Sequence, residues 1–416
     1  MFDSGIHELA HRLDGLPLAI VLDGSFIRRT GMSYRKYLDH YNQTWRELQG
    51  AAPHRGYSNG NMLTVWKLSY NEIKKIFPLV ARLLYLLSFF FQKDIWFELL
   101  QNGLRAPDPP QWFSLVVSTE IHFSQVIEVL LNLPMVQQQL GTGSYSLHPV
   151  VQDWCQHELP RIDLDLKETE RTNSIIAAVA TGYGVPSLSG KVFWILERRL
   201  LPHADGIRQL LNYELETFQN QGLLSVFHSL GRLFWSLGKL KEAEEMYKLA
   251  LTGREKVLGS KNISTIDTIH SIGLLYRGQE RLKEAENMYQ QALIGCQEIL
   301  GPDHISTLGT VHNLGNLYTD QAKWNEAESL YQKVLTGYKK VFSLNHASTL
   351  DIIISFGNLY WNKGEIMKAE EKFKHAYDGW EKIFGPDQPS TIRAISNLGS
   401  IDQNQGRLVE VEKMYQ

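Results

Sequence analysis

Cysteine is almost absent from this chain, and other features that point to particular functions are missing with it. The 416 residues include only Cys155 and Cys296, whose spacing fits neither a disulfide framework nor a zinc site. The net charge of −3 is spread over interspersed acidic and basic residues, so no basic stripe is present to neutralise phosphates. We therefore expect no disulfide-stapled domain and no nucleic acid partner.

Long hydrophobic segments are missing as well. The strongest apolar run, residues 77–91, contains Arg82 and Ser88 and is too short to span a bilayer, so we expect a buried helix there. The N-terminus lacks a basic region followed by an apolar one, which is the pattern of a secretory signal. The expected location is the cytoplasm, without membrane contact.

A 42-residue period is present throughout the C-terminal half. A glycine recurs at this spacing, a small residue follows it after twelve positions, and an aromatic residue follows after four more. The glycines are Gly231, Gly273, Gly315, Gly357 and Gly399, then come Ala243, Ala285, Ala327, Ala369 and Val411, and then Tyr247, Tyr289, Tyr331, Phe373 and Tyr415. Three columns in one register predict an array of repeats.

Each repeat is predicted to be a pair of helices. Apolar residues at helical spacing form two stripes in each unit, and the small residues let the paired helices approach closely, so each glycine is expected to pack on the alanine of its own unit. Ser306 or Thr307 is the expected cap of a first helix, and Gly301 followed by Pro302 is expected to end a second helix. The fold class is therefore mainly all-α.

The repeats resemble the long tetratricopeptide repeats of the kinesin light chain and nephrocystin type. The resemblance rests on Asn313-Leu314-Gly315-Asn316-Leu317-Tyr318, on Ala327-Glu328, and on Leu300-Gly301-Pro302-Asp303-His304. It covers about residues 221–416 as about five units, of which the last is truncated. It implies a right-handed superhelix that binds a protein partner and has no catalytic activity.

Two short motifs in the N-terminal half resemble parts of an NB-ARC ATPase of the STAND class. They are Gly15-Leu16-Pro17-Leu18 and Leu147-His148-Pro149, and they imply a helical subdomain followed by a winged helix. By this resemblance Pro17 would contact adenine and His148 the phosphates. The expected domains are 1–55 (helical remnant), 60–160 (winged-helix-like), 161–220 (helical bridge or degenerate repeat) and 221–416 (repeats).

The phosphate-binding string Gly-x-x-x-x-Gly-Lys-Ser/Thr does not occur in the chain. We therefore expect no ATPase activity and no cofactor, with ADP or ATP bound only if an upstream ATPase domain is present. His7-Glu8-x-x-His11 matches the zinc metalloprotease motif, but Asp14 stands where the extended form of the motif needs glycine. A plain amphipathic helix is the preferred interpretation, and a metalloprotease is a remote alternative.

Polar and aromatic residues recur at fixed offsets from the repeat glycines, on the side expected to line a concave groove. The predicted partner-binding residues are His228, Arg232, Trp235, His270, Arg277, His312, Asn316, Asn358 and Trp361. Stacked repeats lie roughly 10 Å apart, which is too far for the histidines to share a metal. We expect a protein or peptide in this groove, and self-association is left open.

The leading functional hypothesis is a partner-sensing repeat region of a fungal NOD-like receptor. The chain resembles such receptors in its expected domain order, in which a winged helix precedes an array of these repeats. The alternative is a cargo or scaffold adaptor similar to the kinesin light chain, which would use the same repeats but carry heptads in its N-terminal half.

Overall fold

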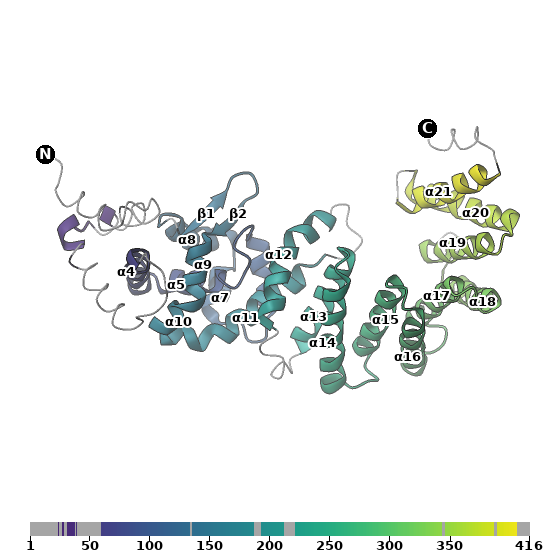
Figure 1. The fold of residues 1–416 in the computed structure, drawn as a ribbon, viewed down its shortest axis with the longest axis horizontal. Coiled ribbons are helices and arrows are strands. Elements are labelled where there is room, and N and C mark those ends of the chain that lie inside the picture. The colour runs from purple at the N-terminus through teal and green to yellow at the C-terminus, as the bar shows by residue number, and fades with distance from the viewer. Residues whose placement is uncertain are drawn as a thin grey trace. The chain divides into compact units, whose positions relative to one another are not determined.

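The computed structural model describes residues 24, 27–28, 31–37, 39, 60–133, 135–186, 193–211, 221–342, 346–386 and 389–405. Most of these residues are helical, and the described part contains one two-stranded sheet (Figure 1). The predicted fold class is confirmed. The chain divides into two compact units, residues 1–233 and 234–416, and the division falls inside α13 (Gln221–Ser236). The predicted domain bounds stay a prediction.

The first unit is a set of helices with one short hairpin. Its described elements are α4 (Gly60–Ile76), α5 (Pro78–Leu87), α6 (Phe97–Asn102), the 3-10 turn η1 (Gly103–Arg105), α7 (Gln111–Val116), α8 (Glu120–Leu131), β1 (Val136–Gln139), β2 (Ser144–Leu147), α9 (Pro149–His157), α10 (Leu159–Ile162), α11 (Leu164–Gly184) and α12 (Phe193–Leu211). The strands pair antiparallel, and Ile95 adds a single bridge to Tyr145. This element order is compatible with a winged helix, whose bounds at 60–160 stay a prediction.

Helix α5 forms the centre of the first unit. It contains most of the apolar run, and seven of its ten residues are buried, as the sequence predicts. Helix α4 ends at Ile76, Phe77 is the N-cap of α5, and Pro78 takes the first position of α5, where a proline fits a helix well. No helix among the described residues is both long and apolar enough to cross a membrane.

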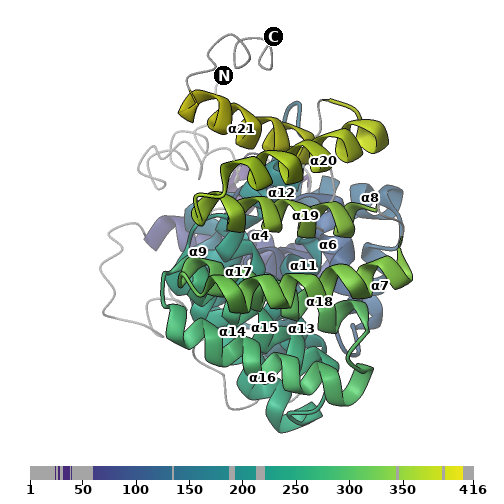
Figure 2. The same ribbon diagram turned by 90° about the vertical axis from the view of Figure 1, so that its right-hand side faces the viewer.

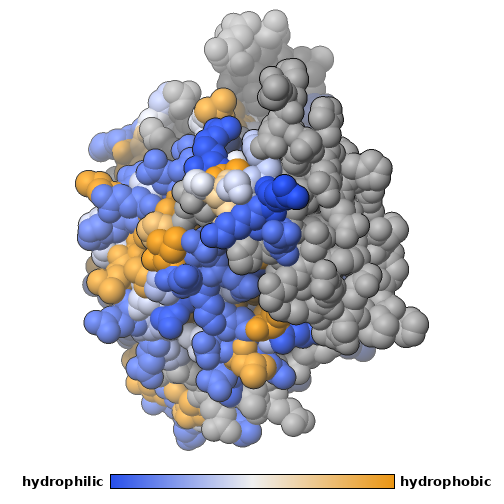
Figure 3. Space-filling view, turned by 90° about the vertical axis from the view of Figure 1, so that its left-hand side faces the viewer, coloured by the Kyte–Doolittle hydropathy of each residue, from blue (hydrophilic) through white to orange (hydrophobic). Residues whose placement is uncertain are grey.

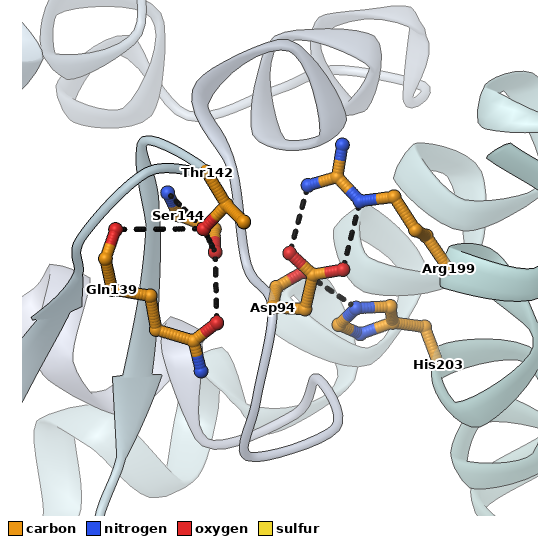
Figure 4. A network of polar contacts seen from close by, with 6 residues as sticks. All are labelled: Asp94, Gln139, Thr142, Ser144, Arg199 and His203. Atoms are coloured by element: carbon orange, nitrogen blue, oxygen red, sulfur yellow. Dashed lines mark hydrogen bonds and ion pairs between the residues drawn. The ribbon is translucent and has the colours of Figure 1, made fainter. Parts of the chain in front are cut away.

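A polar network fastens α12 to the segment that follows α5 (Figure 4). Arg199 binds the Asp94 carboxylate through Nε at 2.8 Å and Nη2 at 2.7 Å. His203, which is fully buried, accepts a hydrogen bond from the Phe91 amide at 3.2 Å and lies 3.0 Å from the Asp94 carbonyl oxygen. Because both ring nitrogens are engaged, this histidine holds α12 in one orientation against residues 91–94.

The visible surface in Figure 3 has no dominant apolar face. Hydrophobic side chains lie there in separate patches among hydrophilic ones. Exposed apolar residues of the first unit include Ile121 and Leu164, each 71% exposed. Scattered side chains of this kind are normal on a protein surface and do not identify a docking site by themselves.

The second unit is a stack of helix pairs. Figure 2 shows its helices lying one above another. They are α14 (Leu240–Leu258), α15 (Ile263–Gly278), α16 (Leu282–Leu300), α17 (Ile305–Asp320), α18 (Trp324–Val341), α19 (Ala347–Asn362), α20 (Ile366–Phe384) and α21 (Pro389–Asn404). The pairs α15–α16, α17–α18 and α19–α20 are three copies of the predicted 42-residue repeat.

The turns between pairs differ in detail from the prediction. Helix α16 ends at Leu300, and Gly301 follows with φ of 90°, as expected for a glycine stop. The cap of α17 is His304, whose imidazole accepts from the Ser306 amide at 3.2 Å. Thr307 instead donates to the Gly301 carbonyl at 2.8 Å. The expectation of a Ser306 or Thr307 cap was wrong, because imidazole nitrogen supplies the same acceptor as a hydroxyl.

The repeat glycines contact a different partner from the one predicted. A Cβ atom built on Gly273 or Gly315 would meet the ring of the aromatic residue sixteen positions later, Tyr289 or Tyr331, at under 3 Å. These aromatic rings, and not the alanines, are the nearest groups. The tyrosine therefore fills space inside its own helix pair, where only glycine leaves enough room.

Candidate functional site

The first helices of successive pairs are joined by polar contacts at a fixed offset. His270 accepts from the Asn313 amide at 2.8 Å, and His312 shares a hydrogen bond of 2.7 Å with Ser355; both partners lie 43 residues further along the chain. Arg277 and Asp320 repeat the same offset with an ion pair of 2.6 Å. The repeat thus places side chains from α15, α17 and α19 on one continuous polar surface.

A cavity of about 410 Å³ opens in this surface. It is lined by Arg277, His312, Asn316, Tyr338, Ser348, Asp351, Ile354, Ser355, Asn358 and Arg393. Four of these residues, Arg277, His312, Asn316 and Asn358, are predicted groove residues, and the structure brings them together. The other six were missed, although Asp351 and Arg393 stand 42 residues apart and could have been found as one more ladder.

Two arginines contribute the positive charge of the cavity. The Nη2 atom of Arg393 lies 2.7 Å from a carboxylate oxygen of Asp351, and the two side chains are 53% and 44% exposed. Such a half-exposed pair contributes about 0–1 kcal/mol to stability. Arg277 pairs with Asp320, which does not line the cavity. Each guanidinium keeps further N–H donors that no described side chain uses.

His312 is an uncharged member of the site. Burial lowers its pKa to about 4, and the charges of Arg277 and Arg393 act in the same direction. The ring is therefore neutral at physiological pH. It can donate or accept a hydrogen bond but adds no positive charge to the cavity.

Two asparagines offer amide groups to a ligand. Asn358 is exposed and makes no hydrogen bond to any residue in the described part of the chain. Asn316 accepts from the Tyr331 hydroxyl at 2.7 Å through Oδ1, which leaves its amide N–H₂ free of described partners. Amides at successive repeats have the donors and acceptors that an extended peptide backbone needs.

The remaining predicted groove residues are placed differently. Trp361 is partly buried and packs against the hydrophobic core of the repeats, and Trp235 is partly buried with its Nε1 atom 3.8 Å from the position of a Cβ on Gly278. His228 and Arg232 belong to the first unit, where Arg232 donates to the Val185 carbonyl at 3.4 Å. Neither His228 nor Arg232 is among the residues that line the cavity.

Of the two predicted nucleotide contacts, only His148 lies among the described residues. His148 is the N-cap of α9, where its Nδ1 atom accepts from the Val150 amide at 3.4 Å. Pro17 and the His7-Glu8-x-x-His11 motif lie outside the described residues. Cys155, on the same helix as His148, is buried, and this burial raises the pKa of its thiol and makes it a poor nucleophile.

Comparison with known proteins identifies the repeats. A family model described as tetratricopeptide repeat matches residues 222–293, 265–340 and 348–416. The C-terminal part of the chain is thus a tetratricopeptide repeat array, a class of fold that acts as a protein-interaction scaffold and not as an enzyme. The observed helix pairs agree with this assignment.

One curated relative is a nucleotide-binding leucine-rich repeat (NLR)-like protein from Hyaloscypha variabilis. It is 26% identical over 271 residues, which cover 62% of this chain and 25% of the relative. The chain thus matches about a quarter of that protein's length.

Two solved structures are similar in part. One contains putative kinesin light chain tetratricopeptide-like repeats from Podosopora anserina (22% identity, TM-score 0.40, 46% of this chain and 91% of that chain). The other is a STAND protein with a tetratricopeptide repeat sensor from Pyrococcus horikoshii (13% identity, TM-score 0.41, 96% of this chain and 65% of that chain).

Proposed function

We propose that this chain is the partner-sensing part of an NLR-type receptor, and that its repeats bind an extended peptide segment of a protein. The observation that carries this proposal is the cavity in which polar groups from α15, α17, α19 and α21 converge. A concave surface built from several repeats suits a ligand that runs along the array.

The chemistry of the lining favours a peptide over an apolar small molecule. Ile354 is the one aliphatic residue of the lining, and amide, hydroxyl, imidazole and guanidinium groups make up most of the remainder. Small-molecule pockets are predominantly apolar with only a few polar groups. Asn316 and Asn358 supply hydrogen bonds to a backbone, and the charged residues supply selectivity.

The extent of the curated match favours a receptor over a free-standing adaptor. The match covers 62% of the chain, whereas the repeat array begins at residue 222 and is shorter than half of it. The similarity to the NLR-like protein must therefore extend into the first unit. A kinesin-light-chain-like adaptor would share the repeats alone.

As part of the receptor proposal, we expect this chain to have no ATPase activity and no cofactor of its own. We also expect it to be located in the cytoplasm. It is supported by the lack of a Gly-x-x-x-x-Gly-Lys-Ser/Thr string in the sequence, and by the use of the His148 ring as a helix cap. The rate of phosphate release from ATP should be the same with the purified chain as in buffer without protein. ATP hydrolysis that remains associated with the chain through further purification would refute the expected lack of ATPase activity.

Selection from a random dodecapeptide display library tests the peptide-binding proposal. We expect the full chain to enrich peptides whose affinity drops at least about fivefold in Asn358→Ala, because an exposed amide is lost from the cavity. Asn325→Ala, an exposed asparagine on the second helix α18, is the matched control and should bind as the wild type does. Peptides insensitive to every cavity substitution would contradict the proposal.

A further inference from the structure

A second cavity lies in the first unit, between α12 and residues 91–94. Its volume is about 330 Å³. Four apolar residues line it, namely Phe91, Trp194, Ile195 and Pro202, together with three cations and one carboxylate. Trp194 is 49% exposed and Ile195 is 43% exposed, so two large apolar side chains of α12 remain in contact with water. This cavity, referred to below as the α12 groove, therefore offers apolar area that a partner can bury.

One wall of the α12 groove is preformed and electrically balanced. The two hydrogen bonds from Arg199 to Asp94 pair the charge of this arginine. The same guanidinium lies 4.2 Å from the centre of the Trp96 ring, and the Phe91 ring packs edge-on against His203 at 6.1 Å between ring centres. Because these side chains are held in place before any ligand arrives, binding need not order them.

Among the described residues, the other two cations of the groove have no partner of opposite charge. Lys93 and Arg198 are both exposed, and neither forms an ion pair with any residue in that part of the chain. Arg198 instead lies over the Trp194 ring, with its guanidinium carbon 5.4 Å from the ring centre. Once Asp94 has balanced Arg199, two positive charges remain beside the apolar residues. This combination is complementary to an acidic partner that carries an apolar side chain.

The backbone adds a hydrogen-bond acceptor to the groove. Pro202 lies inside α12 and has no N–H, so the carbonyl of Arg198, four residues earlier, lacks its usual helical donor. Both residues line the groove, which places this carbonyl at its edge. An N–H group of a bound segment can donate to it there and satisfy a backbone acceptor that the helix leaves open.

We propose that the α12 groove binds an acidic segment of a partner protein, which inserts one large apolar side chain against Trp194. Carboxylates of the segment then lie beside Lys93 and Arg198. The site belongs to the first unit and shares no residue with the cavity of the repeats, so it does not depend on the function proposed for them. A membrane surface fits less well, because the apolar side chains line a hollow instead of protruding from the surface.

Counter-selection of peptides tests the apolar part of the proposal. Random dodecapeptides are selected on the full chain and then depleted on the full chain carrying Trp194→Ala. The remaining peptides should combine an aromatic or large aliphatic residue with Asp or Glu, and fluorescein-labelled forms should bind Trp194→Ala at least about tenfold more weakly than the wild type. Leu164→Ala removes an exposed apolar side chain of α11 outside the groove, and this matched control should bind as the wild type does.

A charge exchange tests the acidic part. Arg198→Gln should weaken binding of these peptides about fivefold, whereas Lys167→Gln, an exposed lysine of α11 outside the groove, should leave it unchanged. On Arg198→Glu, peptides whose Asp and Glu are replaced by Lys should bind better than the acidic originals, which is the reverse of the wild type. Because Trp194 and Arg198 are exposed, the melting temperature followed by circular dichroism should change little.

Three results would overturn the proposal. The first is that no selected peptide depends on Trp194, or that the dependent peptides lack acidic residues. The second is Trp194-dependent binding to phosphatidylserine vesicles without any Trp194-dependent peptide, which would assign the groove to a membrane surface. The third is a dimer in light scattering that Trp194→Ala abolishes, which would assign the groove to a second copy of the chain.

Discussion

The ring of Tyr331 lies directly against Gly315, so that a Cβ atom on this glycine would stand 2.6 Å from Tyr331 Cε1. Both residues belong to the pair α17–α18, and Tyr331 is almost fully buried. The phenol hydroxyl also donates to Asn316 in the cavity lining. The glycine therefore does more than allow two helices to approach, because it fixes the ring that supports a groove residue.

Gly315→Ala should destabilise the array. The added methyl group must displace a buried ring, and overpacking of this kind costs about 1–3 kcal/mol. Gly309 lies in the same helix with no atom within 4 Å of its Cβ position, so Gly309→Ala is the matched control. It should be neutral or stabilising by up to about 1 kcal/mol, since alanine favours helix. The two variants are compared by their urea unfolding midpoints. Equal midpoints would contradict the close contact between Gly315 and Tyr331.

His203 should make the stability of the first unit depend on pH. Burial lowers its pKa to about 4 from an ordinary value near 6.5, with Asp94 raising and Arg199 lowering it to a smaller extent. Between these values the unfolded chain binds a proton that the folded chain does not. Stability is therefore complete above about pH 6.5 and falls as pH drops toward 4, by up to about 3 kcal/mol.

The His203→Gln variant should lose most of this dependence in the unfolding of the first unit, measured in urea at pH 7.5 and pH 5. His375→Gln, at an exposed position on α20, is the control and should keep the wild-type dependence. Asp94 titrates below this window, because the hydrogen bonds from Arg199 lower the pKa of its carboxyl. An unchanged pH slope in His203→Gln would show that His203 is not the group responsible.

Glu286 should stabilise the junction between two repeats. Its carboxylate accepts hydrogen bonds from Tyr318 at 3.1 Å, Gln321 at 3.1 Å and Lys323 at 3.2 Å, all of the following repeat. Glu286→Ala leaves these donors without their acceptor and should cost about 1–2 kcal/mol in urea unfolding. Glu255→Ala, at an exposed position on α14, should cost less than about 0.5 kcal/mol. An equal loss of unfolding free energy in both variants would contradict the proposed role of Glu286 at the junction.

The repeats were predictable because their stability is a sum of equivalent local contacts. Glycine, alanine and tyrosine recur at one period, and each helix pair needs them at the same places. The glycine–aromatic contact was missed since the spacing of Gly315 and Tyr331 shows only that both face the partner helix. Their distance depends on how deeply the ring enters between the helices.

The cavity was only half predictable, for a different reason. Offsets from the glycines select Arg277, His312, Asn316 and Asn358, but the contacts of a side chain depend on its rotamer. Asp351 and Arg393 occupy equivalent positions one period apart, but a search for recurring residue types passes over a position whose charge changes sign. The Asp94–Arg199–His203 network has no repeat at all, and nothing in the sequence joins residues so far apart.

Trp361 is a predicted groove residue whose replacement should affect both folding and binding. From the sequence alone, Trp361→Ala is expected to weaken partner binding by about 2 kcal/mol or more while leaving the melting temperature nearly unchanged. The structure places the indole partly buried against the core cluster of α17–α21, so its removal also leaves a cavity. We now expect a lower melting temperature together with weaker binding. Asn358→Ala should weaken binding alone, because the exposed amide has no described partner to lose.

Trp361→Phe separates the two effects of the tryptophan. Phenylalanine fills much of the same space but lacks the indole N–H and the wider face, so melting should recover most of its loss while affinity stays reduced. Melting is followed by circular dichroism, and affinity by fluorescence polarisation of a selected peptide well below the melting temperature. If Trp361→Ala lowers the melting temperature and the folded protein binds the peptide with wild-type affinity, Trp361 is a core residue only. The partner would then be anchored by Asn358 and the arginines without an aromatic contact.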